Sequence, residues 1–240
     1  MIVFAAFIFL VSLTATKAHI RNAWRGRNGA DWLLDGAGLF CQGIVIPVLQ
    51  LTIVYQLYQY LLPAYAGCLQ WHPVAAFLAS FVLVDYIYYW NHRLLHSRYL
   101  WSVHRVHHTM TTRDVLGTSR NTLWTSFIIV YLWVHGLFLY LLANPSYYAL
   151  GVSLTAALDL WRHSQIEWPE NWLFRWLGGF LILPQDHAWH HAPGDYCNFG
   201  ANFKWWDMLH GTYRKSAAAP DVLGIPVKLN LMQMLFWPLP

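Results

Sequence analysis

Eight of the thirteen histidines lie in three short groups, and these groups constrain the chain more than any other feature. Their spacings are H-x-x-x-H, H-x-x-H-H and H-x-x-H-H. Because residues three or four apart share one face of a helix, each group directs its imidazole rings to one side. Neutral imidazole is a preferred ligand of transition metals, so the pattern indicates metal binding rather than solvated or core histidines. The groups are His92 and His96; His104, His107 and His108; and His187, His190 and His191.

The composition indicates an integral membrane protein. The chain is 57% hydrophobic and 11% charged, whereas about a quarter of the residues are charged in soluble domains. Its Trp, Tyr and Phe residues add an aromatic content suited to membrane interfaces. The three cysteines form no C-x-x-C pair, so neither a zinc ribbon nor a c-type haem is indicated.

The apolar segments predict an all-α fold, an integral membrane helical bundle of about four transmembrane helices with a histidine-rich helical cap. We expect spans over 36–62, 74–90, 123–142 and 147–161, with a kink at Pro47 and a hairpin formed by the last two. Residues 1–16 are short for a span and form either a span or a partly inserted helix. The predicted parts are N-terminal membrane helices at 1–73, a histidine-box catalytic domain at 74–215 and an apolar interfacial tail at 216–240.

The basic residues orient this bundle. Every Lys and Arg lies in 17–35, in 91–121 or beyond 161. Because basic residues concentrate on the cytoplasmic side of a membrane, these segments and the three histidine groups are expected on the cytoplasmic face. The net charge of +4 then follows from topology, and no nucleic-acid partner is expected.

A ninth histidine, His163, follows the last predicted span. Because that span returns the chain to the face of the three groups, we interpret His163 as a ligand rather than an isolated interfacial histidine. A structural zinc ion takes four protein ligands and a catalytic zinc three, so eight or nine imidazoles exceed the need of one ion. The sequence therefore predicts two metal ions held by histidine alone.

Carboxylates near these histidines are candidates to orient them. Asp85 lies two helical turns before His92 and is expected either to ligate a metal or to fix an imidazole, because a carboxylate inside a span is costly. Asp159 precedes His163 by four residues. Asp195 follows the third group and either orients a ligand or is a plain surface residue. The remaining histidines match no group and are expected to be structural: His19, His72, His135 and His210.

The type of ligand limits which metal ions such a site would bind. Imidazole suits zinc, copper, iron and nickel. A site of histidines at a membrane surface fits a two-metal redox centre, and iron is the biological candidate, because an iron pair can activate O2 for attack on an unactivated C–H bond. Zinc stands higher in the affinity order and is a possible substitute in purified protein. The apolar spans would supply a dry cavity for a lipid chain.

Several motifs together resemble the fatty acid hydroxylase and sterol desaturase superfamily of membrane di-iron enzymes. The resemblance covers roughly 74–215. It is carried by HRLLH at 92–96, LWSVHRVHHT at 100–109, HS at 163–164, DHAWHH at 186–191, NFG at 198–200 and WDMLHGTY at 206–213. His210 departs from the aromatic or apolar residue expected before Gly211. The resemblance implies that the nine histidines bind two non-haem iron ions and that Asn198 lies beside them.

The resemblance also implies an oxidoreductase that acts on a lipid C–H bond with O2 and two electrons. Hydroxylation of a fatty-acyl, sterol or related lipid is the leading interpretation, and desaturation is the alternative. No dinucleotide-binding or haem-binding motif is present, so a separate reductase with a ferredoxin or a small cytochrome is the expected electron donor. The short loops and the lack of a eukaryotic retention signal favour a bacterial inner membrane over the endoplasmic reticulum.

Two other classes of function compete with an oxygenase. A membrane zinc hydrolase would carry a glutamate beside paired histidines, and no group here contains Glu. A non-catalytic metal carrier would spread its ligands through the depth of the membrane, whereas these are expected on one side.

Overall fold

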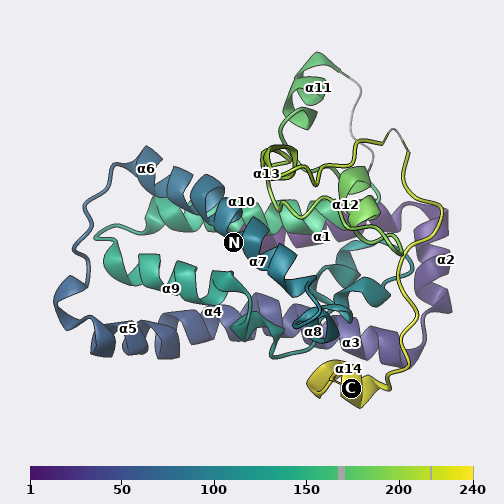
Figure 1. Cartoon of the computed structure of the whole chain (residues 1–240), viewed down its shortest axis with the longest axis horizontal. Coiled ribbons are helices and arrows are strands. Elements are labelled where there is room, and N and C mark those ends of the chain that lie inside the picture. The colour runs from purple at the N-terminus through teal and green to yellow at the C-terminus, as the bar shows by residue number, and fades with distance from the viewer. Residues whose placement is uncertain (167–170, 217, 240) are drawn as a thin grey trace.

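The computed structural model describes residues 1–166, 171–216 and 218–239, and the predicted all-α fold is confirmed. Apart from helices and turns, these residues form only two isolated β-bridges. Figure 1 shows the longer helices running side by side, with α11 projecting from one edge. The helices are α1 (Ile2–Ala15), α2 (Ala18–Gly26), α3 (Gly29–Phe40), α4 (Ile46–Leu49), α5 (Tyr55–Leu61), α6 (Pro73–Leu78), α7 (Val84–Leu95), α8 (Trp101–His104), α9 (Val130–Leu141), α10 (Ser146–Arg162), α11 (Trp172–Gly178), α12 (Pro184–His190), α13 (Trp205–Leu209) and α14 (Leu231–Phe236).

Helices α3, α4 and α5 form one continuous helix of 33 residues, Gly29–Leu61. The side chain of Asn28 accepts a hydrogen bond from the Asp31 amide at 2.8 Å and so caps its first turn. Pro47 lacks the N–H that would bond to the carbonyl four residues earlier. The helix accommodates Pro47 with π-helical turns at Cys41–Val45 and Gln50–Val54 and continues as one element.

A second long helix, Pro73–Leu95, contains α6 and α7 and has 23 residues. The ring of His72 accepts a hydrogen bond from the Val74 amide at its start. The helix continues five residues past the predicted end of its span at 90, so it carries His92 on the same element as Asp85, and His96 directly follows its last residue.

Two helices are long and apolar enough to cross a membrane, Gly29–Leu61 and Pro73–Leu95, among the residues that the structure describes. Helices α1 and α2 pass the same test only as a pair bent by 99°. The span expected at 123–142 differs, because α9 has 12 residues and is about 18 Å long, whereas a bilayer core is about 30 Å thick. Leu123 and Trp124 instead bond to the C-terminal helix, with the Leu123 amide 3.0 Å from the Leu235 carbonyl and the Trp124 indole nitrogen 2.8 Å from the Phe236 carbonyl.

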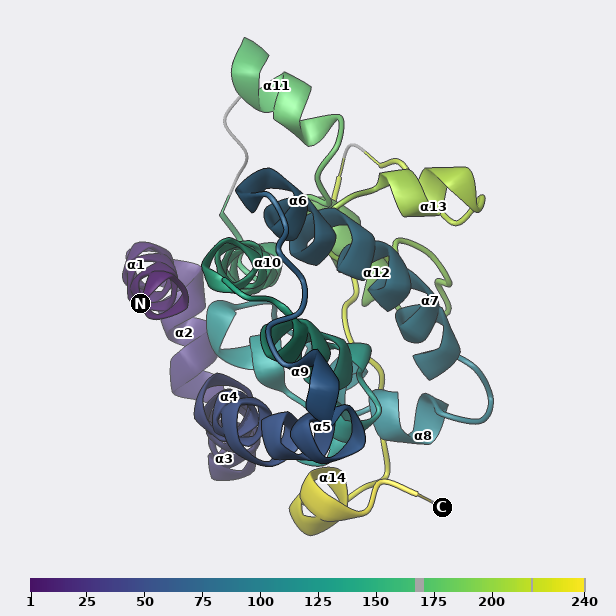
Figure 2. The same cartoon turned by 90° about the vertical axis from the view of Figure 1, so that its left-hand side faces the viewer.

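The apolar contacts join helices that are distant in sequence. Figure 2 shows α6 and α7 on one side of α9 and α10, and the α3–α5 helix on the other. Buried residues of the first pair pack against the hairpin in a cluster of Ala76, Ala79, Val84, Leu142 and Tyr148. A separate cluster joins α3, the second histidine segment and α14 through Leu34, Val106 and Leu235.

The apolar tail packs against the histidine segments. The Gly224 amide donates to the His191 carbonyl at 3.1 Å, and the Ile225 amide donates to the His108 carbonyl at 2.8 Å. Gly224 has a φ of +77°, and a Cβ there would lie 2.7 Å from the Met110 carbonyl oxygen. The described part of this tail therefore braces two of the three groups, a role that its hydropathy does not predict.

The loop after the second histidine group approaches the long N-terminal helix closely at Gly38, where a Cβ would overlap the Ser119 carbonyl oxygen. We expect Gly38→Ala to lower the melting temperature in detergent by roughly 2–10 °C, because overpacking costs about 1–3 kcal/mol. Gly36 in the same helix has open space around its Cα, so Gly36→Ala is the matched control and should melt at or above the wild-type temperature. Equal melting of the two variants would contradict the packing at Gly38.

Candidate metal centre

The nine predicted histidines come from four separate segments that meet at the end of the Pro73–Leu95 helix. Helix α7 carries His92, and His96 directly follows its last residue. The second group occupies α8 and the 3-10 turn that follows it at 107–109. His163 directly follows α10. Helix α12 carries His187 and His190, and His191 directly follows its last residue. All nine rings are buried except that of His96, which is half-buried.

Four rings form a first set, called site 1, consisting of His92, His96, His104 and His190. Their four ligand nitrogens all lie within 4.8 Å of one another. The Nε2 atoms of His92 and His104 are 3.2 Å apart, and those of His96 and His190 are also 3.2 Å apart. One residue of the long membrane helix and the residue that directly follows it thus face one residue from each of the other two groups.

Four other rings form a second set, called site 2, consisting of His107, His163, His187 and His191. Here too the ligand nitrogens lie within 4.8 Å of one another. The Nε2 atom of His187 is 3.1 Å from that of His163 and 3.1 Å from that of His191. The Nε2 atom of His163 is 3.4 Å from that of His107. The isolated histidine therefore lies within a set of ligand-spaced rings.

His108 lies between the two sites. Its Nε2 atom is 3.3 Å from the Nε2 atom of His104 in site 1. Its ring stacks on that of His191 in site 2, with centroids 4.6 Å apart. It therefore joins the two sets into one continuous cluster.

Backbone carbonyls determine the tautomer of two rings in each site. In site 1 the Nδ1 atoms of His92 and His190 lie 2.8 and 2.9 Å from the carbonyls of Phe199 and Cys197. In site 2 the Nδ1 atoms of His107 and His163 lie 3.2 and 2.8 Å from the carbonyls of Arg120 and Asp159. A carbonyl can only accept, so each Nδ1 carries the proton and each Nε2 of the neutral ring carries a lone pair. This is the arrangement found around metal-bound histidines.

Burial keeps these rings neutral. It lowers the pKa of His96 to about 3, and burial together with the neighbouring His163 lowers the pKa of His107 to about 3. Burial likewise lowers the pKa values of His187, His190 and His191 well below the ordinary range. At neutral pH the rings therefore present lone pairs rather than protons, as metal ligands must.

The nitrogen positions fit a cation. The Nε2 atoms of His107 and His163 face each other with lone pairs, a repulsive contact unless a positive ion lies between them. With metal–nitrogen bonds of 2.0–2.1 Å, adjacent ligand nitrogens are about 2.9 Å apart in an octahedron and about 3.4 Å apart in a tetrahedron. The Nε2 contacts within the two sites, 3.1–3.4 Å, fall in that interval. The donor set is therefore suited to two transition-metal ions.

Asp85 and Asp159 have different partners, and Asp159 bonds to one ring of the cluster. The buried Asp85 carboxylate contacts no imidazole and accepts hydrogen bonds from the Asn202 amide at 2.8 Å and the Trp206 indole at 2.7 Å. Asp159 accepts from His163 through its backbone carbonyl, while its carboxylate pairs with Arg162 at 2.6 Å. The Asp159 carboxylate also lies 3.5 Å from the His163 Nδ1 atom.

Asp195 and Asn198 lie beside the third group without touching its rings. The Asp195 carboxylate pairs with Arg214 near the surface. The amide nitrogen of the buried Asn198 donates to the Asp186 carbonyl at 2.8 Å. Asp186 in turn accepts from the Leu183 amide at 2.9 Å and so holds the start of α12. These residues position the helix that carries the ligands.

The sequence does not predict which groups accept the Nδ1 protons, because these acceptors are main-chain carbonyls and every residue type has one. One of their supports does have a sequence signal. Asp207, in the WDMLHGTY segment, accepts from the amides of Phe199 and Gly200 at 2.8 and 2.7 Å. It thereby holds the loop whose carbonyl accepts from His92.

The four remaining histidines lie outside both sites. His135 is buried and lies 2.9 Å from the Tyr148 hydroxyl. His210 stacks on Tyr89 and lies 3.2 Å from the Tyr86 hydroxyl. His19 contacts Gln165, and His72 caps α6. None of them belongs to the two metal-binding sets found among the described residues.

Comparison with known proteins finds relatives that are similar in sequence but no matching solved structure. The alkylglycerol monooxygenase of Danio rerio is 30% identical over 60% of this chain and 32% of its own length. The ornithine lipid hydroxylase OlsE of Rhizobium tropici is 29% identical over 69% of this chain and 51% of its own length. Methylsterol monooxygenase 1-3 of Arabidopsis thaliana is 28% identical over 58% and 48%.

The chain thus covers between about a third and a half of these curated relatives. The family model described as fatty acid hydroxylase matches residues 77–212, more than half of the chain. That range contains all nine clustered histidines and both sites. The chain therefore belongs to the fatty acid hydroxylase family.

Proposed function

We propose that this protein is a membrane di-iron oxygenase that hydroxylates a lipid C–H bond with O2 and two external electrons. The observation that carries the proposal is the pair of four-histidine sites, joined by His108, at the end of a helix long enough to cross a membrane. We take His92, His96, His104 and His190 as ligands of one ion, and His107, His163, His187 and His191 as ligands of the other. His108 is the ninth ligand.

Iron is the proposed metal because the family relatives carry out oxygen chemistry by name and imidazole suits iron. Bound in these sites, an iron pair would supply the two-electron activation of O2 that an unactivated C–H bond requires. The reaction consumes one C–H bond, one O2, two electrons and two protons, and it yields an alcohol and one water. Zinc would occupy the same nitrogens without supplying that redox chemistry.

The protein residues hold the imidazole rings in position and exclude water from the sites. The carbonyls of Phe199, Cys197, Arg120 and Asp159 hold four rings in one tautomer, so little reorganisation is required when the metals bind. The buried rings of Phe199 and Tyr89 pack beside site 1 and exclude water from it. Exclusion of water protects a reactive oxidant from side reactions.

Hydroxylation is proposed over desaturation because three relatives are named monooxygenases or hydroxylases. Their names also support a lipid substrate, since they include an alkylglycerol, an ornithine lipid and a methylsterol. The apolar helices beside the centre would present the substrate chain from within the bilayer.

We further propose that the histidine cap lies on the cytoplasmic face of a bundle with about four membrane-inserted helical segments, in a bacterial inner membrane. The basic segments 17–35, 91–121 and 162–215 support that orientation. In this arrangement α9 and α10 form a short hairpin that enters the bilayer. A separate reductase with a ferredoxin or a small cytochrome would deliver electrons to the same face.

Removal of one ligand should empty one site. We expect His163→Ala to lower the iron content of purified protein from two ions to about one per chain, because the other three ligands of site 2 lose a direct neighbour. The measurement is elemental analysis of protein expressed in iron-rich medium. His210→Phe is the matched control, since it removes a histidine outside both sites and keeps an aromatic ring in the stack. Unchanged iron content in His163→Ala would contradict the assignment of site 2.

Lipid analysis tests the reaction. Cells that express the wild-type protein under ¹⁸O2 should accumulate a lipid heavier by one ¹⁸O atom, and cells that express His107→Ala should lack it. The measurement is mass spectrometry of extracted lipids, with His210→Phe retaining the product. A lipid lighter by two hydrogens and free of ¹⁸O would establish desaturation instead. Identical lipids in the wild-type and His107→Ala cells would contradict an enzymatic role.

A further inference from the structure

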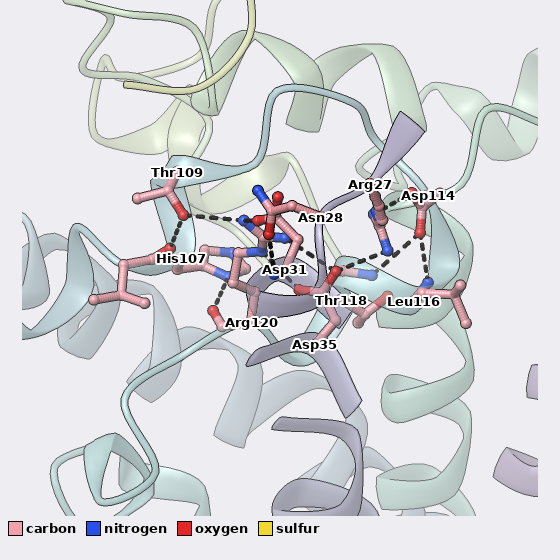
Figure 3. A network of polar contacts seen from close by, with 12 residues as sticks. Arg27, Asn28, Asp31, Asp35, His107, Thr109, Asp114, Leu116, Thr118 and Arg120 are labelled. Carbon is pink, nitrogen blue, oxygen red and sulfur yellow. Dashed lines mark hydrogen bonds and ion pairs between the residues drawn. The ribbon is translucent and has the colours of Figure 1, made fainter. Parts of the chain in front are cut away.

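A buried network of charges connects the N-terminal helices with the segment that follows the second histidine group. Figure 3 shows its core: Arg27 and Asp35 from the start of the chain, and Asp114 and Arg120 from the loop after α8. The side chains of Asp35 and Asp114 are each 1% exposed, those of Arg120 and Arg27 6% and 10%. Two positive and two negative charges therefore balance in a region with little water.

Arg120 makes the most contacts in this network. Its Nε and Nη2 atoms donate to the two carboxylate oxygens of Asp35 at 2.6 and 3.0 Å. Its Nη1 atom lies 2.9 Å from the Asp31 carboxylate and donates to the Thr109 hydroxyl at 3.3 Å. A two-pronged contact of this kind restricts the guanidinium in both position and plane.

Arg27 connects the same carboxylate to the start of the loop. It pairs with Asp35 at 2.8 Å and with Asp114 at 2.6 Å. The other oxygen of Asp114 accepts from the Leu116 amide at 2.8 Å and the Gly117 amide at 3.3 Å. The network thus holds both ends of the 3-10 turn Val115–Ser119, whose last residue precedes Arg120.

This network reaches the metal centre at one atom. The backbone carbonyl of Arg120 accepts from His107 Nδ1 at 3.2 Å and so defines the tautomer of that site 2 ring. Thr109, which also accepts from the Arg120 side chain, lies two residues after His107 on the same turn. The contacts of the Arg120 side chain therefore restrain both the Arg120 carbonyl, which accepts the hydrogen bond, and the turn that carries His107, which donates it.

We infer that Asp35, on the first long membrane helix, is a positioning residue for site 2. It acts through Arg120 and His107 and touches no metal ligand itself. Arg27, Asp31 and Asp35 all precede residues 77–212, which match the family model. The chain thus uses a segment outside the shared family region to complete the geometry of one of its two metal sites. The inference rests on the proposed metal centre.

A titration with Co²⁺ tests this role without reference to activity. Metal-free protein in detergent would be titrated with Co²⁺ while the visible absorption of bound cobalt is recorded. Wild-type protein should bind two ions. Loss of a group that orients a histidine ligand costs roughly 10- to 100-fold in metal affinity. Asp35→Asn should therefore lower the affinity for one of the two cobalt ions by that factor and leave the affinity for the other unchanged. The spectrum of its remaining tight site should match that of His163→Ala.

Two companion variants separate positioning from simple loss of stability. Arg120→Lys keeps the charge and the carbonyl but loses the two-pronged contact, so it should weaken the same site. Val54→Ala cuts a buried side chain in the same helix, about 28 Å along the axis from Asp35. It should lower the melting temperature and leave both cobalt affinities unchanged. Asp35→Glu restores the carboxylate and should recover part of the affinity.

The outcomes distinguish this inference from the proposed function. If the wild-type protein binds fewer than two cobalt ions, the metal centre itself is wrong. If it binds two and Arg120→Lys and Asp35→Asn do so with wild-type affinity, only the role of Asp35 is overturned. Equal weakening of both sites, or failure of both variants to fold, would also overturn it in favour of a general structural role. Where Asp35→Asn alone fails to fold, Arg120→Lys decides.

Discussion

The structure depends on the convergence of imidazole lone pairs in a space with little water. Four Nδ1 atoms face backbone carbonyls, so their Nε2 atoms carry lone pairs directed at other nitrogens. Burial opposes protonation, the one change that would turn such a contact into a hydrogen bond without a metal. The cluster is therefore suited to cations, and the surrounding protein holds the rings in the orientation that bound cations would require.

The residues that hold the backbone around those rings lie far apart in the sequence. Phe199 is held by Asp207, and Arg120 is held by Asp35. The carbonyls of His108 and His191 are bonded by the C-terminal segment at 224–225. The histidine cluster at the end of one helix is thus supported by a helix near the start of the chain and by residues 224–225 near its end. This explains why the helices pack around the centre although few of them carry ligands.

The orientation of each histidine group toward one side and the all-α fold were predictable because both depend on local spacing. Groups at three and four residues share a helix face whatever the tertiary structure, and long apolar runs form helices in a membrane. The length of α9 was not predictable, because Leu123 and Trp124 are apolar but bond to the C-terminal helix. Hydropathy cannot separate a residue buried in protein from one buried in lipid. The same limit applies to the apolar tail. Main-chain acceptors such as the Phe199 carbonyl were not predictable either, because every residue type has a carbonyl.

Folding and metal binding should reinforce each other in this chain. Rings already held in the ligand tautomer bind an ion with little rearrangement, so the ordering cost is met by the fold rather than by the metal. A bound cation would in turn offset the repulsion between the facing lone pairs. A ligand that binds only the folded state at 100 times its Kd adds about 2.7 kcal/mol to stability. Both sites draw ligands from segments more than 80 residues apart, as His96 and His190 are in site 1 and His107 and His191 are in site 2. An ion bound in either site would therefore cross-link the long membrane helix or the second group to the C-terminal half of the chain.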